Sequence, residues 1–189
     1  IKPANLIGTR NEMGMENLAI FSSVVHLGSN PPLIGMITRP VDEVPRHTYQ
    51  NIKSSGFYTI NSVPLQYTRH AHYTSAKFAE DQSEFHACGF TPEYSSGFSA
   101  PFVQESELKL GLKLVDEIPI QQNGTLMLIG EIELLIVNET AIDQEGHIQL
   151  NELNLAGISG LNTYYSLQKK ETYPYARVKD WSLEGEISK

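Results

Sequence analysis

The sequence contains a single cysteine, Cys88, among its 189 residues. An intramolecular disulfide is therefore impossible, and this composition favours a reducing, cytoplasmic setting. Long apolar runs are also missing, because no stretch approaches the roughly 20 residues that a membrane helix needs, so no transmembrane span is expected. The chain begins at Ile1 rather than Met, which leaves a removed signal peptide open at this stage.

Positive charge is scarce as well. The chain has 14 Lys and Arg against 22 Asp and Glu, a net charge of −8. This balance argues against a general nucleic-acid or anionic-membrane binder, because both need a basic surface. It leaves room for a local basic pocket, since an anionic cofactor needs only a few well-placed cations. The length and the 40% apolar fraction fit one globular domain that spans residues 1–189.

Several catalytic and nucleotide-binding motifs are absent. The chain has no Gly-x-Gly-x-x-Gly, no Gly-x-x-x-x-Gly-Lys and no Gly-x-Ser-x-Gly, so it supports neither a Rossmann fold, nor a P-loop, nor a nucleophile elbow. His70 and His72 resemble a metal-binding pair, but residues two apart on a helix point in different directions and no third ligand completes a set. No metal site is expected, and Cys88 is interpreted as a small buried hydrophobe.

The clearest pattern that is present predicts a long β-hairpin. From Leu108 to Leu114, leucines alternate with Lys109, Gly111 and Lys113, as in a strand with one buried face. Asn123-Gly124 then predicts a tight turn in which both residues tolerate positive φ. A second strand is expected over residues 125–137, with one set of side chains facing the same way: Leu126, Leu128, Ile132, Leu134 and Ile136.

The first half of the chain adds strands over residues 6–10, 16–26, 33–38 and 57–63. A helix is expected over residues 48–55, with Thr48 as a capping residue and Gly56 as its left-handed end. Another helix is expected to begin at Thr74 or Ser75 and to continue through Ala79. Many antiparallel strands with a few short helices indicate a mainly β, closed or Greek-key barrel. The segment from Trp181 onward is expected to be loosely ordered or dependent on a partner.

Several motifs, taken in order, resemble one family. The resemblance covers about residues 5 to 177 and consists of these segments: Asn17-Leu18-Ala19 through Ser22-Ser23, Pro31-Pro32, residues 46–52, residues 55–61, residues 74–79, residues 128–132 and residues 157–165. Together they resemble the flavin reductase-like FMN-binding split-barrel family, in its flavoredoxin branch. The resemblance implies a Greek-key split β-barrel, a homodimer, and FMN bound at or near the subunit interface.

The resemblance also implies a set of cofactor-binding residues, each of which has a simpler interpretation. The phosphate group of FMN needs N–H groups, hydroxyls and cations, for which the candidates are Arg39, Thr48, Ser75, Ala76 and Lys77. Capping by the two hydroxyls and solvation of the two cations are the simpler interpretations. For the ring and the ribityl chain the candidates are Asn17, Leu18, Ala19, Ser22, Ser23 and Tyr164. Taken alone, the strand residues are explained more simply by an edge strand beside a turn, and Tyr164 by a core or interface anchor.

The function that follows is an FMN-binding oxidoreductase that moves electrons from NAD(P)H or another donor, through the flavin, to an acceptor. No side chain is expected to act as nucleophile or general base, because the flavin carries the chemistry. Two alternatives remain open. One is an FMN-binding electron carrier without NAD(P)H turnover, and the other is a flavin-free interaction or sensor module.

Overall fold

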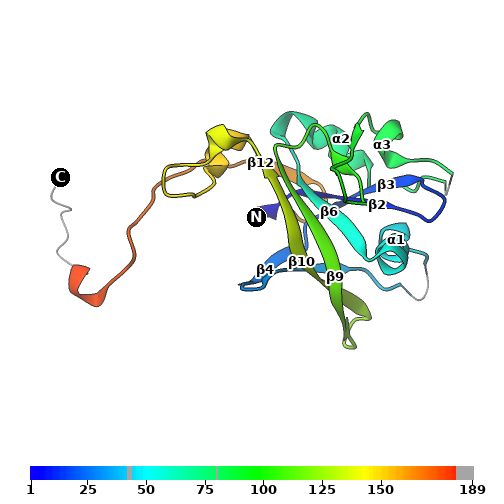
Figure 1. Ribbon diagram of the computed structural model, residues 1–189, viewed down its shortest axis with the longest axis horizontal. Coiled ribbons are helices and arrows are strands. Elements are labelled where there is room, and N and C mark those ends of the chain that lie inside the picture. Colours follow the sequence, from blue (N-terminus) through cyan, green and yellow to red (C-terminus); the bar gives the residue numbers. More distant parts are fainter. Residues whose placement is uncertain (42–43, 80, 182–189) are drawn as a thin grey trace.

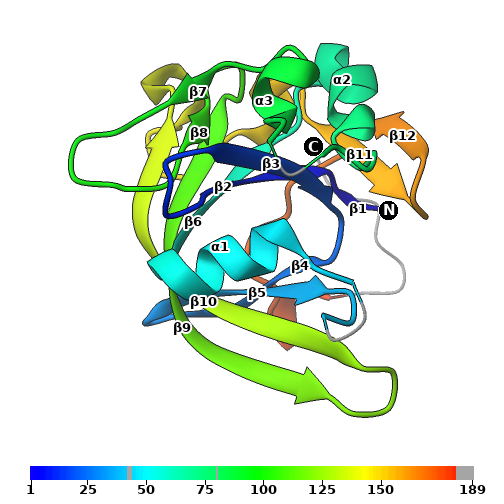
Figure 2. The same ribbon diagram turned by 90° about the vertical axis from the view of Figure 1, so that its right-hand side faces the viewer.

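A curled, seven-stranded antiparallel sheet forms the body of the protein (Figures 1 and 2). The computed structural model describes residues 1–41, 44–79 and 81–181. The strand order is β3-β2-β6-β9-β10-β5-β4. The strands span β2 Asn5–Arg10, β3 Glu16–Phe21, β4 Val24–Ser29, β5 Pro32–Thr38, β6 Phe57–Ser62, β9 Leu108–Ile120 and β10 Thr125–Val137. The two end strands, β3 and β4, are consecutive in the chain, so the sheet curls into a barrel that stays open between them.

Smaller elements surround this barrel. The strands β1 (Lys2–Pro3), β11 (Ala156–Ser159) and β12 (Thr163–Ser166) form a second sheet, and β7 (Pro92–Glu93) pairs with β8 (Phe102–Val103). The helices are α1 His47–Ser55, α2 Thr68–Tyr73 and α3 Glu84–Ala87, with the 3₁₀ turns η1 Leu65–Tyr67, η2 Glu139–Ala141, η3 Leu150–Leu153 and η4 Val178–Asp180. Among the described residues, no helix is long and apolar enough to cross a membrane.

Helix α1 confirms the helix expected over residues 48–55, although not its cap. Gly56 ends it in the left-handed region, with φ of 75°, and donates its N–H to Ile52. Arg46 occupies the N-cap position without a side-chain hydrogen bond, and Thr48 lies inside the first turn. The capping role predicted for Thr48 is therefore wrong. Its hydroxyl instead accepts a hydrogen bond from the side chain of Asn17 on β3.

The strand predicted over residues 16–26 is divided in two. β3 ends at Phe21 and β4 starts at Val24, so Ser22 and Ser23 connect opposite edges of the barrel. Apolar residues lie on both sides of this break, which is why the sequence alone suggests a single element.

The β9–β10 hairpin confirms the long hairpin, with two differences. Gly124 alone has a positive φ, of 70°, while the side-chain Oδ1 of Asn123 accepts hydrogen bonds from the backbone N–H and the hydroxyl of Thr125. Register shifts also occur within the hairpin, and one of them leaves Glu133 without an opposite residue. Because this bulge reverses the alternation, Leu134 and Ile136 face away from the side shared by Leu126, Leu128 and Ile132, contrary to the prediction.

Two apolar cores lie on the two sides of the sheet. The barrel interior contains one core: Ile7, Ile34, Met36, Ile52, Tyr58, Ile60, Leu112 and Leu128. The other core lies outside the barrel, beneath α2, α3 and β11, and includes Leu6, Leu18, Val63, Phe85, Phe90, Val103 and Ile158. Strand β2 contributes to both, which explains why its residues from Asn5 to Thr9 are all buried.

The segment 91–106 covers the outer face of β6 and β9. Lys109, expected on an open face, is only 6% exposed, and its ammonium pairs with Glu93. The hydroxyl of Thr59 donates to the carbonyl of Pro101 over 2.6 Å, and the backbone N–H of Val103 donates to Oδ1 of Asn61 over 3.0 Å. The middle of β9 is therefore buried on both faces rather than on one.

Candidate functional site

The open edge of β3 is the feature around which the expected site residues gather. β3 ends the strand order, so its outer edge has no strand beside it in the described sheet. On the inner face of β3, Asn17 is buried and donates to the hydroxyls of Thr48 (3.1 Å) and Thr9 (3.3 Å). Asn51 of α1 donates to the same Thr9 oxygen over 3.1 Å. This buried amide–hydroxyl network brings Asn17 and Thr48 together and fixes α1 against β2 and β3.

The backbone of Leu18 faces the open edge. Its side chain is fully buried in the outer core, so it offers no side-chain contact to a ligand. Its N–H donates to Oε2 of Glu84 over 3.2 Å, which directs this peptide group away from β2. In a strand, the N–H and C=O of one residue point to the same edge, and this edge alternates from residue to residue. The N–H and C=O of Ile20, two residues after Leu18, therefore also face outward. Ala19, between them, has the smallest side chain of the strand beside this edge.

Glu84 is the residue at this edge that the sequence analysis missed. It starts α3 and is 8% exposed, and burial raises the pKa of its carboxyl, an effect opposed by hydrogen bonds from its own backbone and from Leu18 and by the nearby His47. The only signal in the sequence is a Ser-Glu pair at the start of a short apolar segment, which also describes an ordinary helix start. Its packing against β3 depends on tertiary structure.

Ser22, Ser23 and Arg39 lie close together in the fold at the end of β5. The backbone N–H of Ile37 donates to the carbonyl of Ser23 over 2.9 Å, so the β3–β4 connection lies beside the last residues of β5. Arg39 follows that strand directly and is exposed. Both serines are partly buried. This part of the site combines two hydroxyls with a cation next to the strand opening.

The second predicted helix is not present at residues 74–79. Helix α2 ends at Tyr73, and the residues expected to begin a helix instead terminate one. The hydroxyls of Thr74 and Ser75 donate back to the carbonyls of Ala71 (2.8 Å) and His72 (2.7 Å). The phosphate argument from a helix N-terminus therefore does not apply. Ser75, Ala76 and Lys77 remain exposed in a turn that follows α2.

Tyr164 joins this turn to the outer core. It lies on β12, packs against the outer core, and its hydroxyl is 3.3 Å from Nδ1 of His72 in a hydrogen bond. The rings of Tyr164 and His72 meet edge to face with centroids 5.9 Å apart. Burial raises the pKa of the phenol. Tyr164 thus anchors β12 to His72 of α2, and His72 lies three residues before Ser75.

The candidates therefore form three groups rather than one contiguous cluster of side-chain contacts. Asn17 and Thr48 are joined directly; Ser22, Ser23 and Arg39 are neighbours through β5; and the turn 75–77 is linked to Tyr164 through α2. No ion pair among the described residues involves Arg39 or Lys77. The two cations are available to an anion. On the strand edge, the N–H of Leu18 already donates to Glu84, which leaves the N–H of Ile20 and the carbonyls of Leu18 and Ile20 for the donors and acceptors of a flavin pyrimidine ring.

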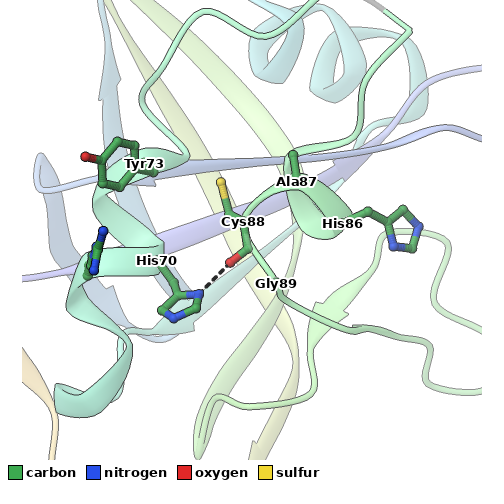
Figure 3. Close-up of a pocket in the computed structure, with 7 residues that line it drawn as sticks. His70, Tyr73, His86, Ala87, Cys88 and Gly89 are labelled. Carbon is green, nitrogen blue, oxygen red and sulfur yellow. Dashed lines mark hydrogen bonds between the residues drawn. The ribbon is translucent and has the colours of Figure 1, made fainter.

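A separate surface hollow of about 500 Å³ lies between α2 and α3 (Figure 3). None of the expected site residues lines it. Nδ1 of His70 is hydrogen-bonded to the carbonyl of Cys88 over 2.7 Å, and the imidazoles of His70 and His86 lie on opposite sides of the hollow. Burial, together with the nearby Glu84, raises the pKa of the Cys88 thiol. Cys88 is consequently a poor nucleophile. In the described part of the chain, no group of three or more His, Cys, Asp or Glu could hold a metal ion.

Comparison with known proteins decides the family. Residues 1–151 match the model of the flavin reductase like domain. The chain belongs to the flavin reductase-like family. The mainly β split-barrel fold is thereby confirmed.

Solved structures agree with this assignment. A split-barrel protein of Shewanella frigidimarina, proposed to be a flavin reductase, is 50% identical, with a TM-score of 0.88 over 93% of this chain and 86% of that one. Flavoredoxin of Desulfovibrio vulgaris is 26% identical, with a TM-score of 0.80 over 93% and 91% of the two chains. An uncharacterized protein of Halalkalibacterium halodurans is 30% identical over 65% of this chain, and the match spans 59% of that protein's length.

Proposed function

We propose that this flavin reductase-like protein binds FMN along the open edge of β3 and acts as an FMN-dependent oxidoreductase. The observation that carries the proposal is the arrangement around that edge. Backbone groups of Leu18 and Ile20 face it, Asn17 and Thr48 are fixed at its inner side, and two exposed cations lie on neighbouring segments. These groups match the three parts of FMN, namely a flat ring with donors and acceptors, a hydroxylated chain and a phosphate.

Each group of residues would have its own task. Ala19 leaves the strand edge accessible, so that peptide groups can bind the pyrimidine edge of the ring. Ser22 and Ser23 would bind the ribityl hydroxyls, while Arg39, Ser75, Ala76 and Lys77 would hold the phosphate through charge-assisted hydrogen bonds. Tyr164 would border the other end of the ring. When bound, FMN supplies the redox chemistry, and the protein binds, orients and shields it.

NAD(P)H is the electron donor in this proposal, with another donor as the alternative, and the acceptor is a separate molecule. Because the chain carries no dinucleotide-binding motif, a nicotinamide nucleotide would bind transiently over the exposed face of the flavin. The setting proposed is the cytoplasm, in keeping with the single cysteine, and neither nucleic acid nor a membrane is a proposed partner.

A homodimer is part of the proposal, and the outer face of β9, β10, β5 and β4 supports it. Register pairs Met127 with both Ile37 and Ile118 on this face. Val25 and Leu27 extend the same apolar face to β4, where they are 48% and 43% exposed. Exposed apolar faces of this kind mark interaction sites. Strand β4 of this face follows Ser23, and strand β5 ends just before Arg39. Because Ser22, Ser23 and Arg39 are proposed to bind FMN, a partner bound to this face would lie next to the flavin.

The experiment is a visible spectrum of the purified protein, repeated after addition of FMN and gel filtration, and then after anaerobic NADH and NADPH. Flavin bands that co-elute with the protein support FMN binding, and bleaching by either nicotinamide supports a reductase. Flavin bands that keep their intensity with both nucleotides would instead identify an electron carrier. A protein that retains no FMN and shows no turnover with excess FMN would overturn the proposal in favour of a flavin-free module.

A further inference from the structure

The chain leaves the body of the protein after β12 and continues as an extended arm, residues 167–181 (Figure 1). Its residues are exposed wherever their exposure is described. One hydrogen bond near its base, from Nζ of Lys169 to Oε1 of Gln149 (3.2 Å), ties it to the body. Pro174 disfavours helix at Tyr173 and so keeps the middle of the arm extended. The arm is thus a chain segment held away from its own core.

Its composition does not suit a solvated segment. The arm carries Leu167, Tyr173, Tyr175, Val178 and Trp181, and the last four are between 70% and 96% exposed. Aromatic side chains of this size are the residues that contribute most to protein interfaces. A segment that stays in water is normally poor in such residues. The arm therefore has the composition of a binding segment.

Charge indicates what the arm binds. Residues 167–181 hold four Lys or Arg and two Asp or Glu, a net charge of +2, whereas residues 1–166 hold nine and eighteen, a net charge of −9. The arm is basic and the body that precedes it is strongly acidic. A second copy of this chain carries the same acidic body, whose net charge is opposite in sign to that of the arm.

A groove lies between the arm and the body of the protein. This groove, of about 1170 Å³, separates the base of the arm from residues 143–155. Asp143 and Glu145 of the body line it together with Tyr173 and Tyr175 of the arm. Hydrogen bonds from the backbone of His147 and Glu145 lower the pKa of Asp143, so this carboxylate stays charged. In Figure 1 the arm leaves on the side of the molecule where β4, with its exposed Val25 and Leu27, also lies.

We propose that the arm is exchanged between two copies of this chain, so that residues 167–181 of each copy pack on the body of the other. The second copy fills the space between arm and body, against the apolar face that ends at β4. Each arm thereby buries its aromatic side chains and places its Lys and Arg residues over an acidic neighbour. The inference rests on the homodimer of the proposed function but needs no bound flavin.

Trp181 is the single tryptophan of the chain and therefore reports on the arm directly. The experiment follows its emission and its quenching by acrylamide in flavin-free protein over a dilution series, with mass measured by light scattering. We expect a dimer in which Trp181 is shielded and blue-shifted, and a shift to the exposed spectrum on dilution to monomer. A dimer whose Trp181 stays fully exposed, or a chain that is monomeric at all concentrations, would overturn the proposal.

Truncation separates the arm from the rest of the interface. Removal of residues 167–189 should raise the dimer dissociation constant by at least about 100-fold, because several aromatic contacts are lost together. The control removes residues 182–189 alone and should leave that constant unchanged. A second control, Gln168→Ser with Thr172→Ser, changes two arm residues but leaves the large apolar side chains of the arm in place. If the triple variant Tyr173→Ser, Tyr175→Ser and Trp181→Ser dimerises like the parent, the arm has no role. All measurements use flavin-free protein, so failure to bind FMN would leave this test intact.

Discussion

The side-chain amide of Asn17 donates to the hydroxyl of Thr48 over 3.1 Å and thereby joins β3 to α1. Both groups are buried, so the bond cannot be replaced by water without rearrangement. We expect Thr48→Val, which keeps the shape and removes the acceptor, to lower the free energy of unfolding by about 1–3 kcal/mol. Denaturant unfolding measures this change.

The matched control for that variant is Thr163→Val. Thr163 lies on β12 and is exposed, so the same chemical change there should alter stability little. If both variants unfold at the same denaturant concentration as the parent, the Asn17–Thr48 bond contributes nothing. FMN affinity measured on Thr48→Val then tells whether the network also positions the strand edge, because the bond holds Asn17 in place.

The role of Lys77 can be tested by comparing flavins with and without a phosphate group. We expect Lys77→Ala to raise the dissociation constant of FMN by about 10- to 100-fold, because a charge-assisted contact is lost. Riboflavin, which has the same ring and no phosphate, should bind the variant and the parent equally. Fluorescence titration with both flavins tests this. Lys53→Ala serves as control, since Lys53 lies on α1 and pairs with Glu117 of β9. Equal losses for FMN and riboflavin would remove Lys77 from the phosphate site.

Tyr58 carries a buried hydroxyl with no hydrogen-bond partner among the described residues. Burial raises the pKa of this phenol. Removing an unpartnered polar atom costs nothing, so Tyr58→Phe should be neutral or stabilising by up to about 1 kcal/mol.

The neighbour of Tyr58 makes a double-mutant cycle possible. A Cβ on Gly130 would lie 2.2 Å from the Tyr58 hydroxyl, so Gly130→Ala should cost about 1–3 kcal/mol through overpacking. Tyr58→Phe should recover part of this loss. Additive effects in thermal or denaturant unfolding would show that the two positions do not interact. Gly28→Ala is the control, because a Cβ there would lie 3.9 Å from the carbonyl oxygen of Pro31, an ordinary contact distance.

Glu84 gives a prediction for pH. Burial raises the pKa of its carboxyl above the ordinary value of 4.5, so the folded state retains a proton that the unfolded chain releases. This contribution favours folding at low pH and is lost as the pH rises through the raised pKa. Glu84→Gln cannot ionise but still offers an oxygen to the N–H of Leu18. The stability of the variant relative to the parent should therefore increase with pH across that range. A constant difference between about pH 4 and about pH 8 in denaturant unfolding would contradict this expectation.

The sequence predicted much of the fold because local patterns and the fold agree. The hairpin of β9 and β10, helix α1 with Gly56, and the split barrel itself were all expected and are confirmed. Where a bulge adds one residue, as at Glu133, alternation alone cannot show the reversal, so Leu134 and Ile136 were assigned to the wrong face.

The candidate site was harder to predict, because it is assembled from backbone edges and turns. Ser75 was expected to begin a helix, since hydroxyl residues favour that position. The same hydroxyl can also bond to a carbonyl three residues earlier, and in the fold it ends α2. Glu84 lies 66 residues from Leu18, to which it bonds, and no local pattern indicates a contact of that range.

The cover that residues 91–106 form over β6 and β9 gives the barrel two unequal halves. β2, β6 and the first half of β9 are enclosed on both faces by it and by the two cores, whereas the second half of β9 and strands β10, β5 and β4 keep an open outer face. Amide hydrogens in the enclosed strands can exchange with solvent only when the whole domain opens, while those of β4 can exchange through local fraying. The protein thus joins a rigid half to a half that can adjust its shape, and the strand connection at Ser22–Ser23 lies where the two meet.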